Sequence, residues 1–208
     1  MKIGINLVGL SYHTINGEHS YKSGYENLFK NVIDPLKKEH DVDLYLYTYH
    51  STEEENIIKT YNPKKHTFKE ISPALETYIK SLEELENEDL DFIIVTRFDL
   101  DIRVPISFNF SKFNFLFKEK EYWKDYNLTT DTLYAFPKHM LQDLISAIHK
   151  TYNNPNNFFC PKLFHCLHNY LIESINESNF YYIDEELSTV AISDKFRLGK
   201  FKHKNYAK

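Results

Sequence analysis

Three charged side chains with close spacing offer the clearest chemistry in this sequence. Arg97, Asp99 and Asp101 follow directly on the short apolar run Phe92–Val95. Two carboxylates separated by one residue in an extended segment project to the same side of the chain. Carboxylate oxygens suit a hard divalent cation such as Mg²⁺ or Mn²⁺, and an arginine guanidinium donates a planar fork of hydrogen bonds to phosphate. The stretch is therefore a candidate site for a metal ion and a phosphate group.

The run that carries these side chains predicts where they lie. A short β-branched apolar run bounded by polar residues is typical of a buried central strand. Ligands of open α/β sheets bind outside the carboxyl ends of the strands, where Arg97, Asp99 and Asp101 would fall. Asp89 and Asp91 repeat the Asp-x-Asp spacing but precede the strand, so we expect them at the opposite edge. The alternative for Asp99 and Asp101 is an ordinary surface pair at a solvated strand end.

Hydrophobic periodicity along the rest of the chain predicts the scaffold. Before Arg103, strands alternate with helices, which is the pattern of a parallel sheet covered by helices. Ser23 and Glu26 have the spacing of a capping box for the first helix. After the acids the pattern becomes mixed, and the tail beyond Asp194 reads as basic and irregular. We predict an α/β fold in one domain, with strands at 2–10, 41–50, 66–71, 92–95, 108–117, 132–136 and 180–183, and helices at 25–38, 51–61, 73–85, 138–150 and 161–175.

Composition narrows the class of protein. The chain has 208 residues, 42% of them hydrophobic and 26% charged, which is ordinary globular usage and argues against disorder. A net charge of −5 gives no electrostatic footprint for nucleic acid. No apolar run is long enough to span a membrane or resembles a signal peptide. Cys160 and Cys166 do not form a disulfide framework, so we expect a cytoplasmic protein.

The segment Asp-Phe-Ile-Ile-Val-Thr-Arg-Phe-Asp-Leu-Asp, residues 91–101, resembles the metal-binding motif of GT-A-type glycosyltransferases. Its wording is similar to small glycosyltransferases encoded by large algal DNA viruses, which would place the protein in a host cytoplasm. The resemblance implies a GT-A-like, Rossmann-like domain in which residues 1–103 bind a nucleoside-diphosphate sugar and residues 104–208 bind a glycan acceptor. It implies Mn²⁺ or Mg²⁺ on Asp99 and Asp101, with Arg97 and Asp99 against the donor, for which a UDP-sugar is favoured.

Two loops at the same predicted edge are candidates for nucleotide contacts. GT-A enzymes hold the nucleotide in the loop after the first strand, which by this resemblance points to Gly9, Ser11 and Tyr12. Thr48 and Tyr49 end the second predicted strand, and an aromatic ring there could stack on a base. The alternatives are a plain surface loop and a packed tyrosine. The sequence contains neither a GxGxxG fingerprint nor a P-loop lysine signature.

An inverting glycosyl transfer also needs a general base near the acceptor hydroxyl. Asp131 is the first candidate, at the junction of a polar loop and a short strand in a setting that GT-A families use for a catalytic or acceptor-side acid. Glu121 and Asp125 compete from the same loop, where Tyr122 and Trp123 could stack on a sugar face. The alternative for Asp131 is a side chain that bonds its own turn, and a retaining enzyme would not need the base.

A second group of metal-ligating residue types follows later in the chain. Cys160, His165, Cys166 and His168 lack the spacing of a usual zinc site, so core cysteines and packed histidines are the favoured interpretation. His203 is a possible third metal ligand by analogy with some GT-A families, against the alternative of an unstructured tail.

The leading hypothesis is a metal-dependent glycosyltransferase. A nucleotidyltransferase or phosphohydrolase would use the same acids for Mg²⁺ and would release pyrophosphate or phosphate rather than a nucleoside diphosphate. A non-catalytic glycan-binding domain would use the aromatic surface, given 16 Phe and 16 Tyr, and would bind glycans without nucleotide or metal.

Overall fold

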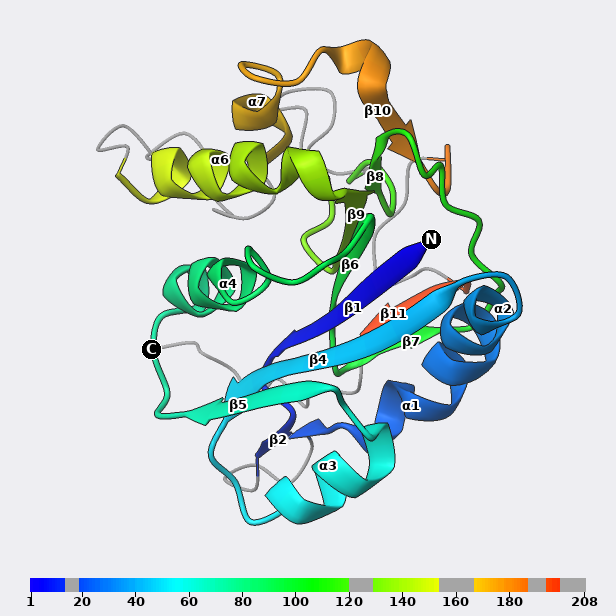
Figure 1. The fold of residues 1–208 in the computed structure, drawn as a ribbon, viewed down its shortest axis with the longest axis vertical. Coiled ribbons are helices and arrows are strands. Elements are labelled where there is room, and N and C mark those ends of the chain that lie inside the picture. Colours follow the sequence, from blue (N-terminus) through cyan, green and yellow to red (C-terminus); the bar gives the residue numbers. More distant parts are fainter. Residues whose placement is uncertain (14–18, 120–128, 154–166, 187–193, 199–208) are drawn as a thin grey trace.

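The computed structural model describes residues 1–13, 19–119, 129–153, 167–186 and 194–198. Its centre is a seven-stranded sheet in the order β10-β8-β9-β6-β1-β4-β5. The strands β1, β4, β5 and β6 run parallel, and β9 is antiparallel to both β6 and β8 (Figure 1). This confirms the predicted α/β fold with a mostly parallel sheet and a mixed second half. The sheet strands are β1 Lys2–Gly9, β4 Asp41–Tyr49, β5 Lys65–Lys69, β6 Phe92–Arg97, β8 Phe113–Phe115, β9 Leu133–Pro137 and β10 Phe180–Tyr182.

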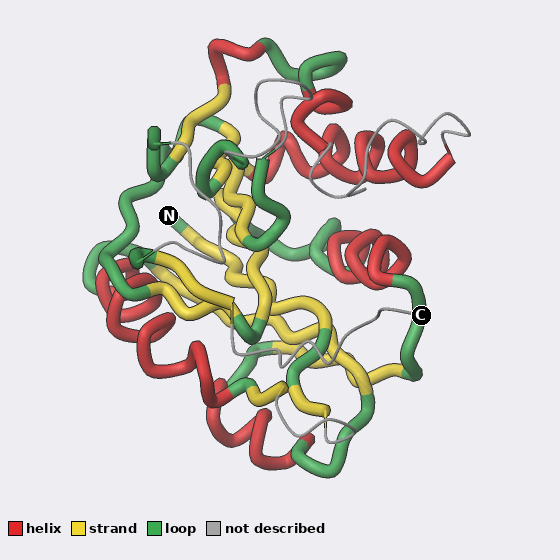
Figure 2. The backbone as a smooth tube through the Cα atoms, turned by 180° about the vertical axis from the view of Figure 1, so that it is seen from behind, coloured by secondary structure: helices red, strands yellow, loops and turns green. Residues whose placement is uncertain are grey.

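Helices cover both faces of the sheet, as the ribbon and the tube views show (Figures 1 and 2). On one face α4 (Ala74–Glu83), α6 (Leu141–Asn153) and α7 (Leu167–Leu171) pack over Ile93, Val95 and Tyr134. On the other face Ile94 and its neighbours lie under a continuous helical segment and α3. That face carries α1 Lys22–Leu28, the π-helix η1 Phe29–Ile33, α2 Asp34–Lys37 and α3 Glu54–Tyr61.

Alternation along each central strand explains the two cores. In β6, Phe92 and Ile94 face the core under α1, whereas Ile93 and Val95 face the core under α4. All four side chains are at most 1% exposed, as expected of a parallel strand buried on both faces. Arg97 is the last residue of the strand and lies on the same face as Ile93 and Val95, which is the α4 side.

Smaller elements lie beside the main sheet. A two-stranded sheet pairs β7 (Leu100–Ile102) with β11 (Phe196–Leu198), and a second pairs β2 (Tyr12–His13) with β3 (His19–Ser20). The short 3-10 helices are η2 Lys138–Met140 and η5 Glu177–Asn179. The tail after Asp194 is therefore not irregular throughout, because Phe196 is 1% exposed and anchors β11 in the core.

Two other local expectations are wrong. The first helix begins at Lys22, so Ser23 lies inside it and bonds the Ser20 carbonyl instead of capping the helix. In the Phe-rich stretch only Phe113–Phe115 is a strand, whereas Phe110 packs edge-on against Phe92 with ring centroids 5.0 Å apart. Of the helix predicted at 161–175, the structure describes Leu167–Leu171 as helical, and residues 161–166 lie outside the described residues.

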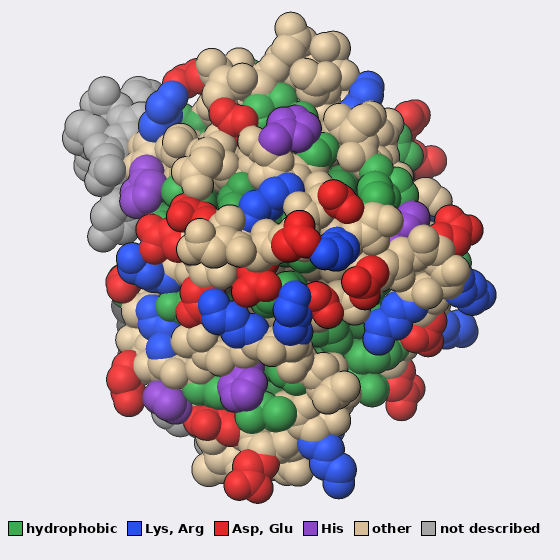
Figure 3. Space-filling model, viewed as in Figure 1, with side chains coloured by type: hydrophobic (Ala, Val, Ile, Leu, Met, Phe, Trp, Pro, Cys, Tyr) green, Lys and Arg blue, Asp and Glu red, His purple; other side chains and the backbone are tan. Residues whose placement is uncertain are grey.

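The visible surface mixes both signs of charge. Figure 3 shows basic and acidic side chains side by side across the face seen in Figure 1. Among the residues that the structure describes, each helix is too short or too polar to cross a bilayer.

Candidate functional site

The order of the strands reverses between β1 and β6, and this marks the carboxyl ends of these two strands as a candidate site. From β1 the chain crosses to β4 on one side, and it later returns to β6 on the other side of β1. Such a reversal opens a crevice between the carboxyl ends of the two strands, which is where ligands of open α/β sheets bind. Here those ends are Gly9 and Arg97, and Val8 is the direct partner of Arg97 in the sheet.

Gly9 suits close approach of a ligand. Its φ of +94° is a conformation that L side chains rarely adopt, and an added Cβ would meet nothing within 4 Å. The glycine is therefore needed for the backbone turn that ends β1, and the space beside it is open.

Arg97 and Asp99 form a bidentate ion pair at this crevice. The Nε and Nη2 atoms of Arg97 donate to the two carboxylate oxygens of Asp99, each at 2.9 Å. The Asp99 side chain is 3% exposed, and that of Arg97 is 27% exposed. Burial disfavours the charged guanidinium, but Asp99 and the nearby Asp131 outweigh it and raise the pKa of Arg97. The pair therefore holds a cationic group whose remaining N–H donors face a partly open edge.

Asp101 has separate partners from those of Asp99. Its Oδ1 accepts a hydrogen bond from Asn27 of α1 at 2.6 Å, and its Oδ2 accepts one from Arg103 at 2.9 Å. The helix lies close here, because a Cβ on Gly24 would come within 2.5 Å of the Leu100 carbonyl oxygen. Asp101 therefore ties β7 to α1.

These contacts bear on the expected metal ion. All four oxygens of Asp99 and Asp101 already accept hydrogen bonds from protein groups. Within the described ranges, no three His, Cys, Asp or Glu side chains form a group that could hold a metal ion. The carboxylates have the right chemistry for Mg²⁺ or Mn²⁺, but Asp99 and Asp101 are bonded to different partners, so a metal would have to share their oxygens with Arg97, Asn27 and Arg103 or displace these groups. The donor set as it stands does not fit, so no step below is derived through a metal.

The antiparallel strand β9 brings Asp131 to the same edge. Thr96 pairs with Leu133 across the sheet, and the Thr96 hydroxyl donates to the Thr132 carbonyl at 3.2 Å. Asp131 is partly exposed, and its charge contributes to the raised pKa of Arg97. The structure thus brings Arg97, Asp99 and Asp131 together from two strands that are neighbours in the sheet.

Sequence reasoning missed a tyrosine at the centre of this group. Tyr78 of α4 donates from its hydroxyl to the Asp131 carbonyl oxygen at 3.4 Å. Burial raises the pKa of Tyr78, Asp131 and Asp99 add to the rise, and Arg97 opposes it. Burial and Asp131 likewise raise the pKa of Tyr134. The sequence did not single out Tyr78, because its position on the buried face of a helix is the same as that of an ordinary core residue.

Most side chains expected to contact the nucleotide are buried or hydrogen-bonded within the protein. Ser11 and Thr48 are buried and bonded to each other, with Thr48 Oγ1 2.7 Å from Ser11 Oγ. Tyr49 is 8% exposed, and its hydroxyl lies 2.8 Å from Thr77 Oγ1 at the start of α4. Tyr12 is partly buried in β2 and packs on the core under α1. These side chains brace the edge, while Gly9 contributes backbone to it.

Other predicted residues lie away from this edge or outside the described residues. Asp91 accepts the backbone N–H of Lys2 at the amino end of β6, as its position before the strand implied. His168 is 3% exposed and packs against Phe115, and burial lowers its pKa. Glu121, Tyr122, Trp123, Asp125, Cys160, His165, Cys166 and His203 fall outside the described residues.

Comparison with known proteins supports the fold. No protein-family model matches the chain, and no curated protein matches it, so the similarity to viral glycosyltransferases is not supported. A solved structure from Vibrio cholerae RC9, titled a nucleoside-diphosphate-sugar pyrophosphorylase, superposes with a TM-score of 0.52. The two chains are 15% identical, and the match covers 86% of this chain and 90% of that one. This likeness shows a shared fold.

Proposed function

We propose that this protein is a transferase that uses a nucleoside-diphosphate sugar, and that it transfers the sugar to a hydroxyl of a glycan acceptor. The observation that carries the proposal is the Arg97–Asp99 pair beside Gly9 at the sheet's reversal point, with Asp131 on the next strand. A similar fold in a protein whose title names nucleoside-diphosphate sugars adds support.

Arg97 would neutralise the diphosphate. When a glycosyl group leaves, negative charge develops on the β-phosphate, and a fixed cation at that position lowers the barrier. Asp99 uses both of its oxygens to hold the guanidinium plane, so little reorganisation is needed when the diphosphate arrives. The Gly9 backbone leaves room for the phosphates, and Ser11 and Thr48 keep the adjoining strand ends in register.

Asp131 would act as general base in an inverting transfer. Its carboxylate would accept the proton of the acceptor hydroxyl while that oxygen attacks the anomeric carbon and the diphosphate departs. Tyr78 would position Asp131 through its bond to the Asp131 carbonyl. The residues after Arg103, which contribute β9 and Asp131, would form the acceptor side, and residues 1–103 the donor side.

Calorimetric titration with UDP and GDP, each in Mn²⁺ and in EDTA, tests the donor site. We expect one nucleotide, with UDP favoured, to bind wild-type protein and to bind Arg97→Met at least about tenfold more weakly, since one phosphate contact is lost. Arg103→Met is the matched control and should bind normally. Equal binding in EDTA would show that the donor binds without a metal, and failure of both nucleotides to bind would refute the proposed function.

A second candidate is nucleotidyl transfer, favoured by the likeness to the pyrophosphorylase. That reaction joins a nucleoside triphosphate and a sugar phosphate and releases pyrophosphate. Incubation with a UDP-sugar and glycan acceptors, and separately with UTP and sugar 1-phosphates, distinguishes the two. Release of UDP supports glycosyl transfer, whereas release of pyrophosphate supports nucleotidyl transfer.

A further inference from the structure

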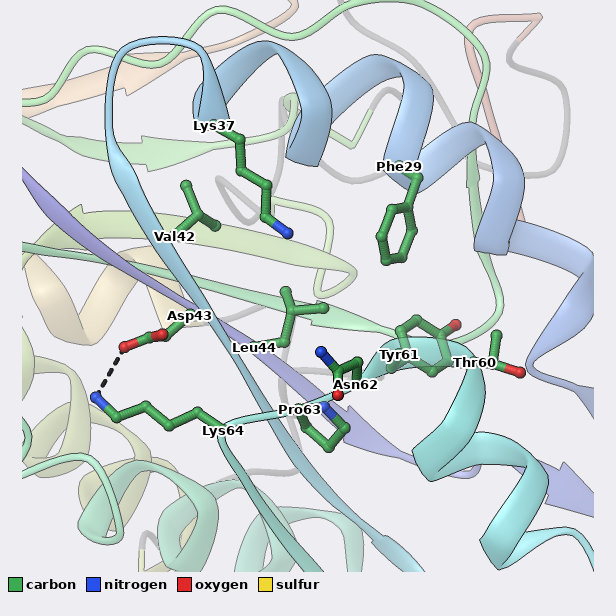
Figure 4. Close-up of a pocket in the computed structure, with 10 residues that line it drawn as sticks. All are labelled: Phe29, Lys37, Val42, Asp43, Leu44, Thr60, Tyr61, Asn62, Pro63 and Lys64. Atoms are coloured by element: carbon green, nitrogen blue, oxygen red, sulfur yellow. Dashed lines mark hydrogen bonds and ion pairs between the residues drawn. The ribbon is translucent and has the colours of Figure 1, made fainter.

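A groove of about 390 Å³ lies well away from the candidate site (Figure 4). It runs between the π-helix and α2 on one side and the end of α3 on the other, over the amino-terminal part of β4. The candidate site lies at the carboxyl ends of β1 and β6, so the groove belongs to the other end of the sheet. The residues that line it are Phe29, Lys37, Val42, Asp43, Leu44, Thr60, Tyr61, Asn62, Pro63 and Lys64.

One lysine in the groove differs from its neighbour. Figure 4 shows the Lys37 ammonium extending over the groove, and Lys37 makes no hydrogen bond or ion pair with the residues that the structure describes. Lys64 is instead tied to Asp43 at 2.7 Å and to Glu88 at 3.4 Å. Within the lining, Asp43 is paired with Lys64, so Lys37 is the charged side chain of the groove that is available to a ligand.

Uncharged polar side chains add hydrogen-bonding capacity. Thr60 and Asn62 line the groove, and the Asn62 amide makes no side-chain hydrogen bond in the described part of the chain. Asn62 holds its position because it ends α3 in the left-handed conformation, with a φ of 46° and its N–H bonded to the Ile58 carbonyl. The groove thus presents the Lys37 ammonium and the Asn62 amide.

The apolar wall includes a half-buried aromatic ring. Phe29 opens the π-helix Phe29–Ile33 and lies with its ring centroid 6.2 Å from that of Tyr61. A π-turn is rare and recurs at functional sites. Val42 and Leu44 of β4 complete the apolar part of the lining.

We propose that this groove binds an acidic sugar residue, a pyranose that carries one carboxylate. A sugar ring combines a flat C–H face, which packs on an aromatic ring such as Phe29, with hydroxyls that take hydrogen bonds from a group such as the Asn62 amide. The carboxylate pairs with Lys37 in a charge-assisted hydrogen bond. The volume suits a ligand of one or two rings. The proposal does not depend on the transfer reaction, because the groove shares no residue with the site around Arg97.

Titration of the whole chain with sodium glucuronate, followed by amide shifts in ¹H–¹⁵N spectra, tests the groove. We expect saturable shifts at Thr60, Asn62 and Lys64 with a dissociation constant on the order of 1 mM, as for a single ring with a few placed contacts. Glucose should bind about tenfold more weakly, since it lacks the carboxylate.

Lys37→Met keeps the apolar stem of the side chain and removes the charge. It should weaken glucuronate binding about tenfold and leave glucose binding unchanged. Lys38→Met removes a neighbouring exposed lysine that does not line the groove, and this variant should bind glucuronate normally. Arg97→Met should also bind normally, which separates this test from that of the donor site.

Three results would overturn the proposal: no saturable shift with glucuronate, equal loss in Lys37→Met and Lys38→Met, or tighter binding of uridine monophosphate than of glucuronate at the same amides. The last result would identify the groove as a nucleotide site.

Discussion

The Arg97–Asp99 pair should contribute much more stability than its sequence neighbour, the Arg103–Asp101 pair. Both pairs have Nε–carboxylate distances of 2.9 Å, and both join residues two apart. They differ in burial, because the Asp99 side chain is 3% exposed and Asp101 16%, while Arg97 is 27% exposed and Arg103 36%. They also differ in geometry, because Arg97 donates two hydrogen bonds to its partner and Arg103 donates one, so the chain contains a less buried, single-bonded pair for comparison.

The expected loss in the free energy of unfolding depends on which charged group each substitution leaves without its partner. Removing one partner of a buried pair costs about 3–5 kcal/mol, because the other charge stays buried without compensation. Arg97→Met removes the bidentate partner of the buried Asp99 carboxylate and should cost about 3 kcal/mol. Asp99→Asn strands a guanidinium that is 27% exposed and lies near Asp131, so about 2 kcal/mol is expected. Arg103→Met breaks a more exposed pair and should cost no more than about 1 kcal/mol.

Urea unfolding at pH 7, followed by circular dichroism, measures these values. The two single variants and the double variant Arg97→Met/Asp99→Asn complete a double-mutant cycle, whose coupling energy we expect at about 1.5–3 kcal/mol. The dependence of the free energy of unfolding on urea should stay constant across the series, so that midpoints report stability.

Small and additive stability losses for the two single variants would refute the claim that the buried pair stabilises the protein. If Arg97→Met and Asp99→Asn each cost less than about 0.5 kcal/mol and their effects simply add, the pair makes no net contribution in solution. A cost for Arg103→Met equal to that for Arg97→Met would show that burial does not set the strength of these pairs.

Three further predictions concern pH, packing and catalysis. Burial raises the pKa of Tyr45 to about 12, so between pH 10 and pH 12 this side chain ionises only in the unfolded state and contributes a fall in the free energy of unfolding of up to about 1.4 kcal/mol per pH unit. Other buried tyrosines such as Tyr78 and Tyr134 add to the fall, so Tyr45→Phe should reduce the slope in urea titrations by the Tyr45 share alone, and an unchanged slope would contradict the assignment. Gly24→Ala should lower the free energy of unfolding by at least about 2 kcal/mol, because its Cβ would meet the Leu100 carbonyl. Gly9→Ala adds a Cβ in open space and should cost about 1 kcal/mol of backbone strain. Thermal unfolding measures both losses, and a larger loss for Gly9→Ala would contradict the prediction. Asp131→Asn should lower turnover by about 10²-fold or more without changing nucleotide affinity, and undiminished turnover would exclude Asp131 as the base.

Local sequence determined most of the scaffold. The strand–helix alternation before Arg103 predicted four parallel strands and the helices between them. A strand buried on both faces appears as a short apolar run, whereas a helix buried on one face has apolar residues spaced three or four apart. The abrupt end of Phe92–Val95 also predicted that Arg97 lies at the carboxyl edge of the sheet, and Arg97 is the last residue of β6.

Partners at long sequence separation could be decided only by the tertiary structure. Asp99 and Asp101 look equivalent in sequence, yet one pairs with Arg97 and the other with Asn27, which is 74 residues away. Tyr78 contacts Asp131, 53 residues away, because β9 pairs antiparallel beside β6. The apolar pattern of α4 predicts that Tyr78 is buried but not which residue it contacts. β11 formed for the same reason, since its hydrogen bonds and the burial of Phe196 depend on β7. Periodicity reports which face of an element is buried, and only packing determines what that face meets.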